Sequence, residues 1–214
     1  MTNDKIQLVA VFTGDLVGST NLTKAQIDAA FSLLENCAKR AEEWHGTSHS
    51  FSRHRGDGWQ VILEHPKYVL RLAIIFRAAL KSLGPEFDTY IGIADGKVDV
   101  SDQTDLNKRN DRVFIDSGRA LEAVKSGPKL DIHMAYDSNS AEAAAITLAD
   151  KIVSDWTPAQ AEAITQMLIN TSPPNYTKLA KILGKSRQTV TKTLTAAGLH
   201  SISIAINLME QTDD

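Results

Sequence analysis

Residues 6–20 read IQLVAVFTGDLVGST: an apolar, β-rich run over Ile6–Phe12 that passes into a loop with two glycines and one aspartate. Residues 24–44 follow, and their apolar side chains recur at the spacing of an amphipathic helix. The start of the chain is therefore predicted to form a strand, a glycine-bearing loop and a helix.

Strand and helix patterns continue to alternate after this first unit. Strands are predicted within 51–63, 87–100 and 129–134, and helices at 68–83, 116–125 and 140–152. Residues 51–63 form a hairpin joined at Arg55-Gly56-Asp57-Gly58, since Asp-Gly between strand-like runs is a strong turn signal. Gly96 is expected to break the next strand, and residues 101–110 are polar enough to form a loop. The order β-α-β-β-α-β with an added α-β predicts an α+β protein with a ferredoxin-like, palm-like sheet and helices on one face.

Beyond Ser154 the pattern contains helices only, so we predict two domains, residues 1–154 and 155–214. Thr157-Pro158 has the residue types that begin a helix. Residues 201–209 are apolar at helical spacing and are expected to form a closing helix or a dimer seam.

Two short helices are predicted within this second domain, at residues 176–183 and 187–197. Gly184-Lys185-Ser186 lies between them and combines a glycine suited to a left-handed turn with a serine suited to cap the next helix. Ala180, Gly184 and Val190 stand where a helix-turn-helix needs a small residue, a turn glycine and a core aliphatic. The second domain is therefore predicted to be an all-α helix-turn-helix domain, similar to those of bacterial transcriptional regulators.

Charge is unevenly distributed along the chain. The net charge is −3, yet residues 163–209 contain no Asp or Glu, and their five Lys and Arg residues all lie between Lys178 and Lys192. Such a basic patch is typical of DNA-binding modules. The residues expected to contact double-stranded DNA are Lys185, Ser186, Arg187, Gln188, Thr189, Thr191 and Lys192. A helical hairpin used for dimerisation or protein binding is the alternative.

Two aspartates mark a second candidate site. Asp15 ends the first strand and Asp57 lies at the tip of the hairpin, and these strands are neighbours in a split β-α-β sheet. Their carboxylates are hard oxygen ligands that suit Mg²⁺ or Mn²⁺ held with nucleotide phosphates. The loop Leu16-Val17-Gly18-Ser19-Thr20 is expected to open a helix directly, and the N–H groups of a helix N-terminus favour a phosphate. The alternative is a loop cap and a hairpin-turn residue.

The segments FTGDLVGST (12–20) and RHRGDG (53–58) resemble the two metal-aspartate motifs of class III nucleotidyl cyclases. Over nearly its whole length the chain resembles the SatD family, bacterial proteins that couple a cyclase-like N-terminal domain to a C-terminal helix-turn-helix. The resemblance implies a nucleoside triphosphate or another nucleotide as ligand and metal ligation by Asp15 and Asp57. The nucleotide-binding residues would be Gly14, Leu16, Val17, Gly18, Ser19, Thr20, Arg53 and Gly56.

The chain departs from the cyclase pattern at a later helix. Cyclases of this class carry Val-Asn-x-Ala-x-Arg-Leu there, whereas residues 115–121 read IDSGRAL, with Asp116 in place of the Asn and Ala120 in place of the Arg. Losing donors that stabilise developing charge costs orders of magnitude in rate. The first hypothesis is therefore a DNA-binding transcriptional regulator with a degenerate cyclase-like domain for nucleotide or metal binding or dimerisation. The alternative is a metal-dependent cyclase or related phosphoryl-transfer enzyme.

Composition sets the remaining expectations. The chain has 43% hydrophobic and 23% charged residues, which is ordinary for a globular protein, and no apolar run is long enough for a membrane helix. Cys37 is the only cysteine, so an internal disulfide is excluded and a cytoplasmic location is expected. Both proposed domain types act as pairs, so a homodimer is predicted. Arg71 and Arg77 are expected on a solvated helix face.

Overall fold

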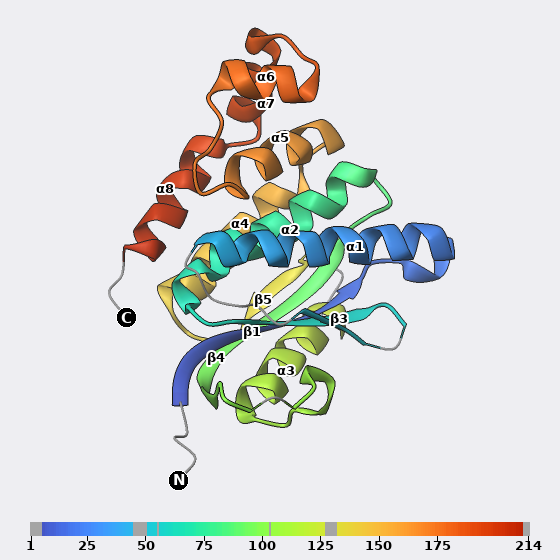
Figure 1. Ribbon diagram of the computed structural model, residues 1–214, viewed down its shortest axis with the longest axis vertical. Coiled ribbons are helices and arrows are strands. Elements are labelled where there is room, and N and C mark those ends of the chain that lie inside the picture. The colour runs from blue at the N-terminus through green and yellow to red at the C-terminus, as the bar shows by residue number, and fades with distance from the viewer. Residues whose placement is uncertain (1–5, 45–50, 55, 103, 127–131, 212–214) are drawn as a thin grey trace.

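The computed structural model describes residues 6–44, 51–54, 56–102, 104–126 and 132–211. Its centre is a sheet of five strands in the order β2-β3-β1-β4-β5 (Figure 1). The strands are β1 (Ile6–Leu16), β2 (Phe51–Arg53), β3 (Gly58–Leu63), β4 (Thr89–Asp99) and β5 (Met134–Tyr136). Neighbours among the first four strands are antiparallel, and β5 joins β4 in parallel. The molecule is thus a mixed α+β protein, and its first four strands have the order and directions of a split β-α-β sheet.

Helices cover both faces of this sheet. The helices of the sheet-bearing part are α1 (Lys24–Ala41), α2 (Val69–Leu83), α3 (Arg112–Ser126) and α4 (Ala141–Ser154). In Figure 1, α1 and α2 lie on one side of the strands and α3 lies on the other. The expectation that helices cover one face only is therefore wrong.

The reason can be read along β1. Ala10 and Phe12 face the core that includes α1 and α2, whereas Val9 and Val11 belong to a second, smaller cluster with Val113 of α3. A strand that is apolar on both faces must be covered on both faces. The run IQLVAVF shows this directly, because its apolar residues do not alternate with polar ones.

Two glycines of β4 let α3 lie close to the sheet. A Cβ at Gly92 would lie 2.2 Å from the carbonyl oxygen of Ser117, and one at Gly96 would lie 3.0 Å from the Cβ of Val113. Gly96 does not break β4, contrary to expectation, because it pairs with Val9 in a continuous register. The close approach of helix and sheet explains the glycine instead.

Other helix and strand boundaries differ from the predicted ones by a few residues. The helix expected at 116–125 begins at Arg112, and a short 3₁₀ helix, Leu106–Lys108, lies in the segment expected to be loop. Of the strand predicted at 129–134, residues 129–131 lie outside the described residues, and the observed β5 begins at Met134. Three further 3₁₀ helices are found at Ser19–Asn21, Glu42–Trp44 and Pro66–Tyr68.

The rest of the described chain is helical. It forms α5 (Pro158–Leu168), α6 (Tyr176–Leu183), α7 (Arg187–Ala196) and α8 (Leu199–Glu210). Thr157 caps α5 with a capping box, as the sequence predicts. Helix α5 packs on α2, and the main hydrophobic core continues from the sheet into all four helices. Figure 1 shows α6 and α7 at the end of the molecule farthest from α3.

Two arginines of α2 hold these layers together. Arg77 is fully buried and donates to Asp88, at 2.8 and 2.6 Å, and to Asp150 of α4, at 2.5 Å. Arg71 donates to both carboxylate oxygens of Glu210 in α8, each at 2.6 Å. The prediction of a solvated face is wrong for both residues, because α4, α5 and α8 return from later sequence to cover α2.

Cys37 is buried, and burial raises the pKa of its thiol to about 12. Among the helices in the described part of the chain, none combines the length and apolarity that spanning a membrane requires.

Candidate functional site

The pairing of β1 with β3 brings the two predicted aspartates together. Asp15 is opposite Gly58 in the register, so Asp57 lies beside the end of β1, and its carbonyl accepts the Leu16 N–H at 3.1 Å. The carboxyl groups of Asp15 and Asp57 are close enough to shift each other's pKa. The expected convergence of these side chains is thus present in the geometry.

The two carboxyl groups differ in pKa. Burial, together with the adjacent Asp57 carboxyl, raises the pKa of Asp15 above its ordinary value, although Lys125 opposes this shift. Burial acts on Asp57 in the same direction, but hydrogen bonds from Ser19 and Asp15 outweigh it and lower the pKa of Asp57.

A cation lies against this pair. The ammonium of Lys125, in the last turn of α3, donates a hydrogen bond to Oδ2 of Asp15. The contact raises the pKa of Lys125. Sequence reasoning missed this residue. Val113, Ser117, Leu121 and Lys125 recur every four residues, and this stripe could have indicated that Lys125 continues the face of α3 that lies on the sheet.

The donor set suits a divalent cation. Two neighbouring carboxylates are hard oxygen ligands of the kind that Mg²⁺ and Mn²⁺ prefer. The Lys125 ammonium supplies a positive charge beside them. Within the described residues, no cluster of three or more His, Cys, Asp or Glu side chains could hold a metal. Further ligands would have to come from water or from a substrate's phosphates.

Two backbone N–H groups of the predicted phosphate loop, those of Leu16 and Val17, bond to the protein itself. The N–H of Val17 donates to the Asp88 carbonyl at 2.9 Å, as that of Leu16 does to Asp57. Gly14 is packed against the ring of Trp59, since a Cβ there would lie 2.1 Å from it. Ser19 and Thr20 belong to the 3₁₀ helix that follows Gly18, and Ser19 donates to the carboxylate of Asp57.

The first α-helix therefore does not begin at this loop. The N-terminus of α1 is satisfied by its own capping box, formed by Thr23 and Gln26. The expectation that the loop opens a helix directly is corrected to a short 3₁₀ turn followed by a separately capped helix.

The Arg53 side chain contacts α1 and the Gly56 carbonyl, and not the carboxylates of Asp15 and Asp57. The Arg53 guanidinium donates to Asp28 of α1 at 2.9 Å and lies 4.0 Å from the centre of the Phe31 ring. It also donates to the Gly56 carbonyl at 3.5 Å. The ion pair thus directs Arg53 toward α1, whereas the Asp15 carboxylate faces Lys125 of α3.

The residues at the degenerate cyclase motif pair with each other. Asp116 accepts from Arg112 and from Arg119, each at 2.8 Å, and Ala120 is buried. The extra carboxylate is therefore neutralised within its own helix, and Arg119 is engaged there.

The second candidate site is the surface of α6, α7 and the turn between them. Gly184 adopts the left-handed conformation, with φ of 62°, and the N–H of Lys185 closes the turn on the Ala180 carbonyl at 2.9 Å. Ser186 caps α7 by accepting the Thr189 N–H at 3.0 Å. Val190 anchors the helix in the core. The turn and caps form as the sequence predicts.

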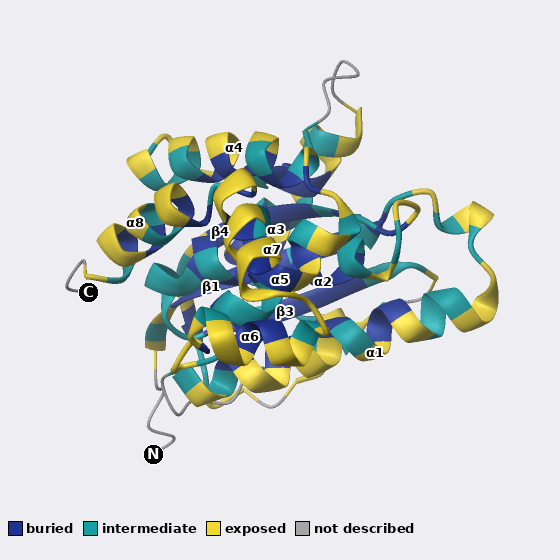
Figure 2. Ribbon diagram, turned by 90° about the horizontal axis from the view of Figure 1, so that it is seen from above, coloured by how far each residue is buried: buried dark blue, intermediate teal, exposed yellow. Residues whose placement is uncertain are grey.

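The outer face of α7 is open to solvent. The seven residues expected to contact DNA, Lys185, Ser186, Arg187, Gln188, Thr189, Thr191 and Lys192, are all exposed. Figure 2 shows exposed segments on both α6 and α7. Within the described part of the chain, none of the basic side chains of this segment has a carboxylate partner. Their charge is available to a ligand.

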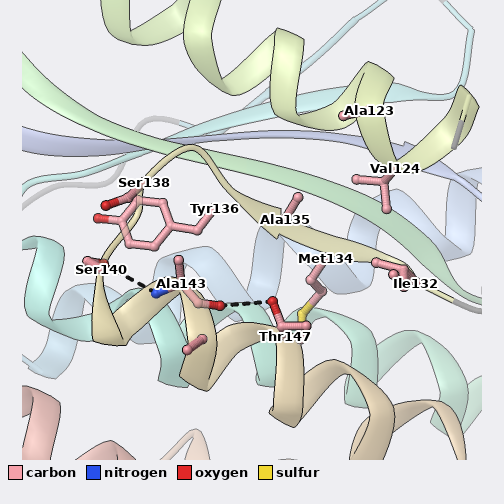
Figure 3. Close-up of a pocket in the computed structure, with 11 residues that line it drawn as sticks. Ala123, Val124, Ile132, Met134, Ala135, Tyr136, Ser138, Ser140, Ala143 and Thr147 are labelled. Carbon is pink, nitrogen blue, oxygen red and sulfur yellow. Dashed lines mark hydrogen bonds between the residues drawn. The ribbon is translucent and has the colours of Figure 1, made fainter.

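A pocket of about 450 Å³ lies elsewhere, between α3, β5 and α4 (Figure 3). Its walls are mainly apolar and include Val124, Met134 and Ala143, with Tyr136 at one end. It contains none of the residues that the sequence singled out.

Comparisons with known proteins identify no family for the chain. No family model matches it, and no curated protein matches it. The SatD resemblance therefore stays a prediction.

Several solved structures show slight similarity, and three of them are nucleotide cyclases. A bacterial light-regulated adenylyl cyclase has a TM-score of 0.44 and 14% identity, over 62% of this chain and 43% of that chain. A second structure of a bacterial light-regulated adenylyl cyclase has a TM-score of 0.41 and 14% identity, over 62% of this chain and 76% of that chain. The guanylyl cyclase Cya2 has a TM-score of 0.39 and 17% identity, over 60% of this chain and 83% of that chain. The chain spans less than half the length of the first of these proteins. Similarities of this extent assign neither an activity nor a substrate to it.

Proposed function

We propose that the chain is a DNA-binding regulator in which α6 and α7 form a helix-turn-helix and α7 enters the major groove of a duplex. One observation carries the proposal: α7 is capped by Ser186, anchored by Val190 and Leu194, and presents an uncompensated basic face to solvent. A recognition helix needs these properties, because its inner face must be held rigidly while its outer face reaches bases and phosphates.

The exposed side chains of this region suit two kinds of contact, with base edges and with phosphates. Arg187 and Gln188 can pair with base edges, whereas Lys185 and Lys192 suit phosphates. The hydroxyl of Thr191 donates to the Arg187 carbonyl at 3.0 Å, so its methyl group is the part available to a base. The N-cap Ser186 lies at the positive end of α7, where a phosphate is also favoured.

The division into residues 1–154 and 155–214 belongs to this proposal. The first part would be the sheet-bearing body and the second the DNA-binding part. Homodimerisation also remains a prediction. Helix α8 packs on α2 and α4, and its Leu199, Ile202 and Ile206 are buried, while Ile204 and Leu208 are exposed and available to a second copy.

Fluorescence anisotropy with a labelled duplex tests the proposal. The wild-type protein should bind at low salt and lose about 100-fold in affinity between 50 and 200 mM salt, as expected when about four phosphates are neutralised. Absence of binding to any duplex at low salt would exclude the proposal.

A second candidate function is metal-dependent nucleotide binding or phosphoryl transfer at Asp15 and Asp57. The adjacency of the two carboxyl groups at the end of β1 favours it. When bound, a divalent ion would activate a hydroxyl and stabilise a leaving oxygen. Asp15 and Asp57 would hold that ion, and Ser19 would keep the Asp57 carboxylate oriented.

Incubation with each nucleoside triphosphate and Mn²⁺, followed by chromatography, checks this candidate. Any turnover should be slow, because Ala120 cannot supply the charge-stabilising donor of cyclases. It should also disappear in the Asp15→Asn, Asp57→Asn double variant. Identical traces from the wild type and the double variant would exclude catalysis at this pair.

A further inference from the structure

The contact between Lys125 and Asp15 joins residues that are 110 positions apart in the sequence. Both partners are partly sheltered, since the Lys125 side chain is 35% exposed and that of Asp15 is 14% exposed. An ammonium held this way is screened less than one on an open surface. The ion pair is therefore a feature of the site and not a random surface contact.

Helix α3 is fixed where it delivers this ammonium. Ser117 shares a hydrogen bond of 2.8 Å with Thr13, which lies on the same face of β1 as Asp15. The missing side chain of Gly92 lets the backbone of Ser117 and Leu121 rest on β4. Lys125 is one turn beyond Leu121, so its position over the end of β1 follows from the packing of α3.

We infer that the Lys125 ammonium occupies the cation position of the Asp15–Asp57 pair and competes with a divalent metal for it. The inference rests on the second candidate function, since it concerns the same carboxylates. With Lys125 in place, an incoming divalent ion meets two negative charges and one positive charge at close range. Repulsion between the ion and the ammonium weakens binding, whereas the carboxylates alone would neutralise the ion.

The location of Lys125 makes this competition reversible. It is the penultimate residue of α3, and its ammonium lies at the end of a flexible side chain of four carbons. Release of the ammonium needs a rotamer change in the last helical turn and no movement of the sheet. The same residue would thus exclude metal from the resting site and leave it when a stronger competitor arrives.

Titration of metal-free protein with Mn²⁺, with the free ion followed by electron paramagnetic resonance, tests the inference without any enzymatic activity. Lys125→Met removes the ammonium and keeps much of the aliphatic length, and it should bind Mn²⁺ at least about tenfold more tightly than wild type. Lys125→Gln should do the same and serves if the methionine variant folds poorly, as judged by circular dichroism. Lys39→Met is the matched control, because it removes an exposed ammonium that pairs with Glu35 on α1.

The outcomes are separable. A gain in Lys125→Met that Asp15→Asn abolishes supports the competition. Equal Mn²⁺ affinity in wild type, Lys125→Met and Lys125→Gln, lost on Asp15→Asn, overturns the inference and leaves the metal site standing. Absence of Mn²⁺ binding in every variant overturns the inference and the second candidate function together.

Discussion

Replacing Arg77 with methionine is expected to lower the free energy of unfolding by about 3–5 kcal/mol, because it leaves two carboxylates in the interior without their cation. The guanidinium is fully buried, and Asp150 is nearly so, with 2% of its side chain exposed. Arg77 also donates to the Ser154 hydroxyl at 3.3 Å. One side chain thus joins α2, the start of β4 and α4, and its loss should loosen all three.

Urea denaturation followed by circular dichroism measures this effect. Arg112→Met is the control, since Arg112 pairs with Asp116 at an exposed position and should change stability by less than about 1 kcal/mol. Combining Arg77→Met with Asp88→Asn and Asp150→Asn should recover much of the loss, because the buried charges are then gone. If the free energy of unfolding of Arg77→Met is within about 1 kcal/mol of the wild-type value, the network does not stabilise the fold.

Loss of two cations from α7 should weaken DNA binding strongly. The Arg187→Ala, Lys192→Ala double variant is expected to bind a duplex roughly 100-fold more weakly than wild type at low salt. The slope of log affinity against log salt should also fall by about 1, because Lys192 is assigned to a phosphate, whereas loss of the base contact from Arg187 should reduce sequence preference. Both side chains are exposed, so the fold should be unaffected.

The control for this variant carries the same change in net charge. Lys24→Ala with Lys39→Ala removes two exposed cations from α1, where each pairs with a carboxylate four residues away. Anisotropy should give wild-type affinity for this control. Equal losses in both double variants would mean that net charge, and not the face of α7, governs binding.

Local signals in the sequence account for much of the fold. Asp-Gly at the hairpin tip, the apolar run of β1 and the caps of α5 and α7 each lie within a few residues of the feature that they predict. The split β-α-β order followed from these elements, and the strand order agrees with it. The position of α3 follows from a different signal, because β1 is apolar on both faces and the second face needs a helix to cover it.

Long-range ion pairs account for most of the remaining errors. Arg77 meets Asp150 from 73 residues away, Arg71 meets Glu210 from 139, and Lys125 meets Asp15 from 110. A period of 3.6 residues shows which face of a helix is apolar, but it does not show which carboxylate arrives later in the chain to pair with a cation. The convergence of Asp15 and Asp57 was predictable because adjacent strands fix it, whereas the position of Lys125 depends on the packing of α3.

Amide hydrogen exchange, measured with and without a duplex, shows whether the exposed face of α7 contacts DNA. On addition of a duplex, we expect exchange to slow mainly in residues 184–196, with little change in the strands of the sheet. Exchange that slows in the sheet or α3 and leaves residues 184–196 unchanged would contradict it, as would a failure of DNA to alter exchange anywhere.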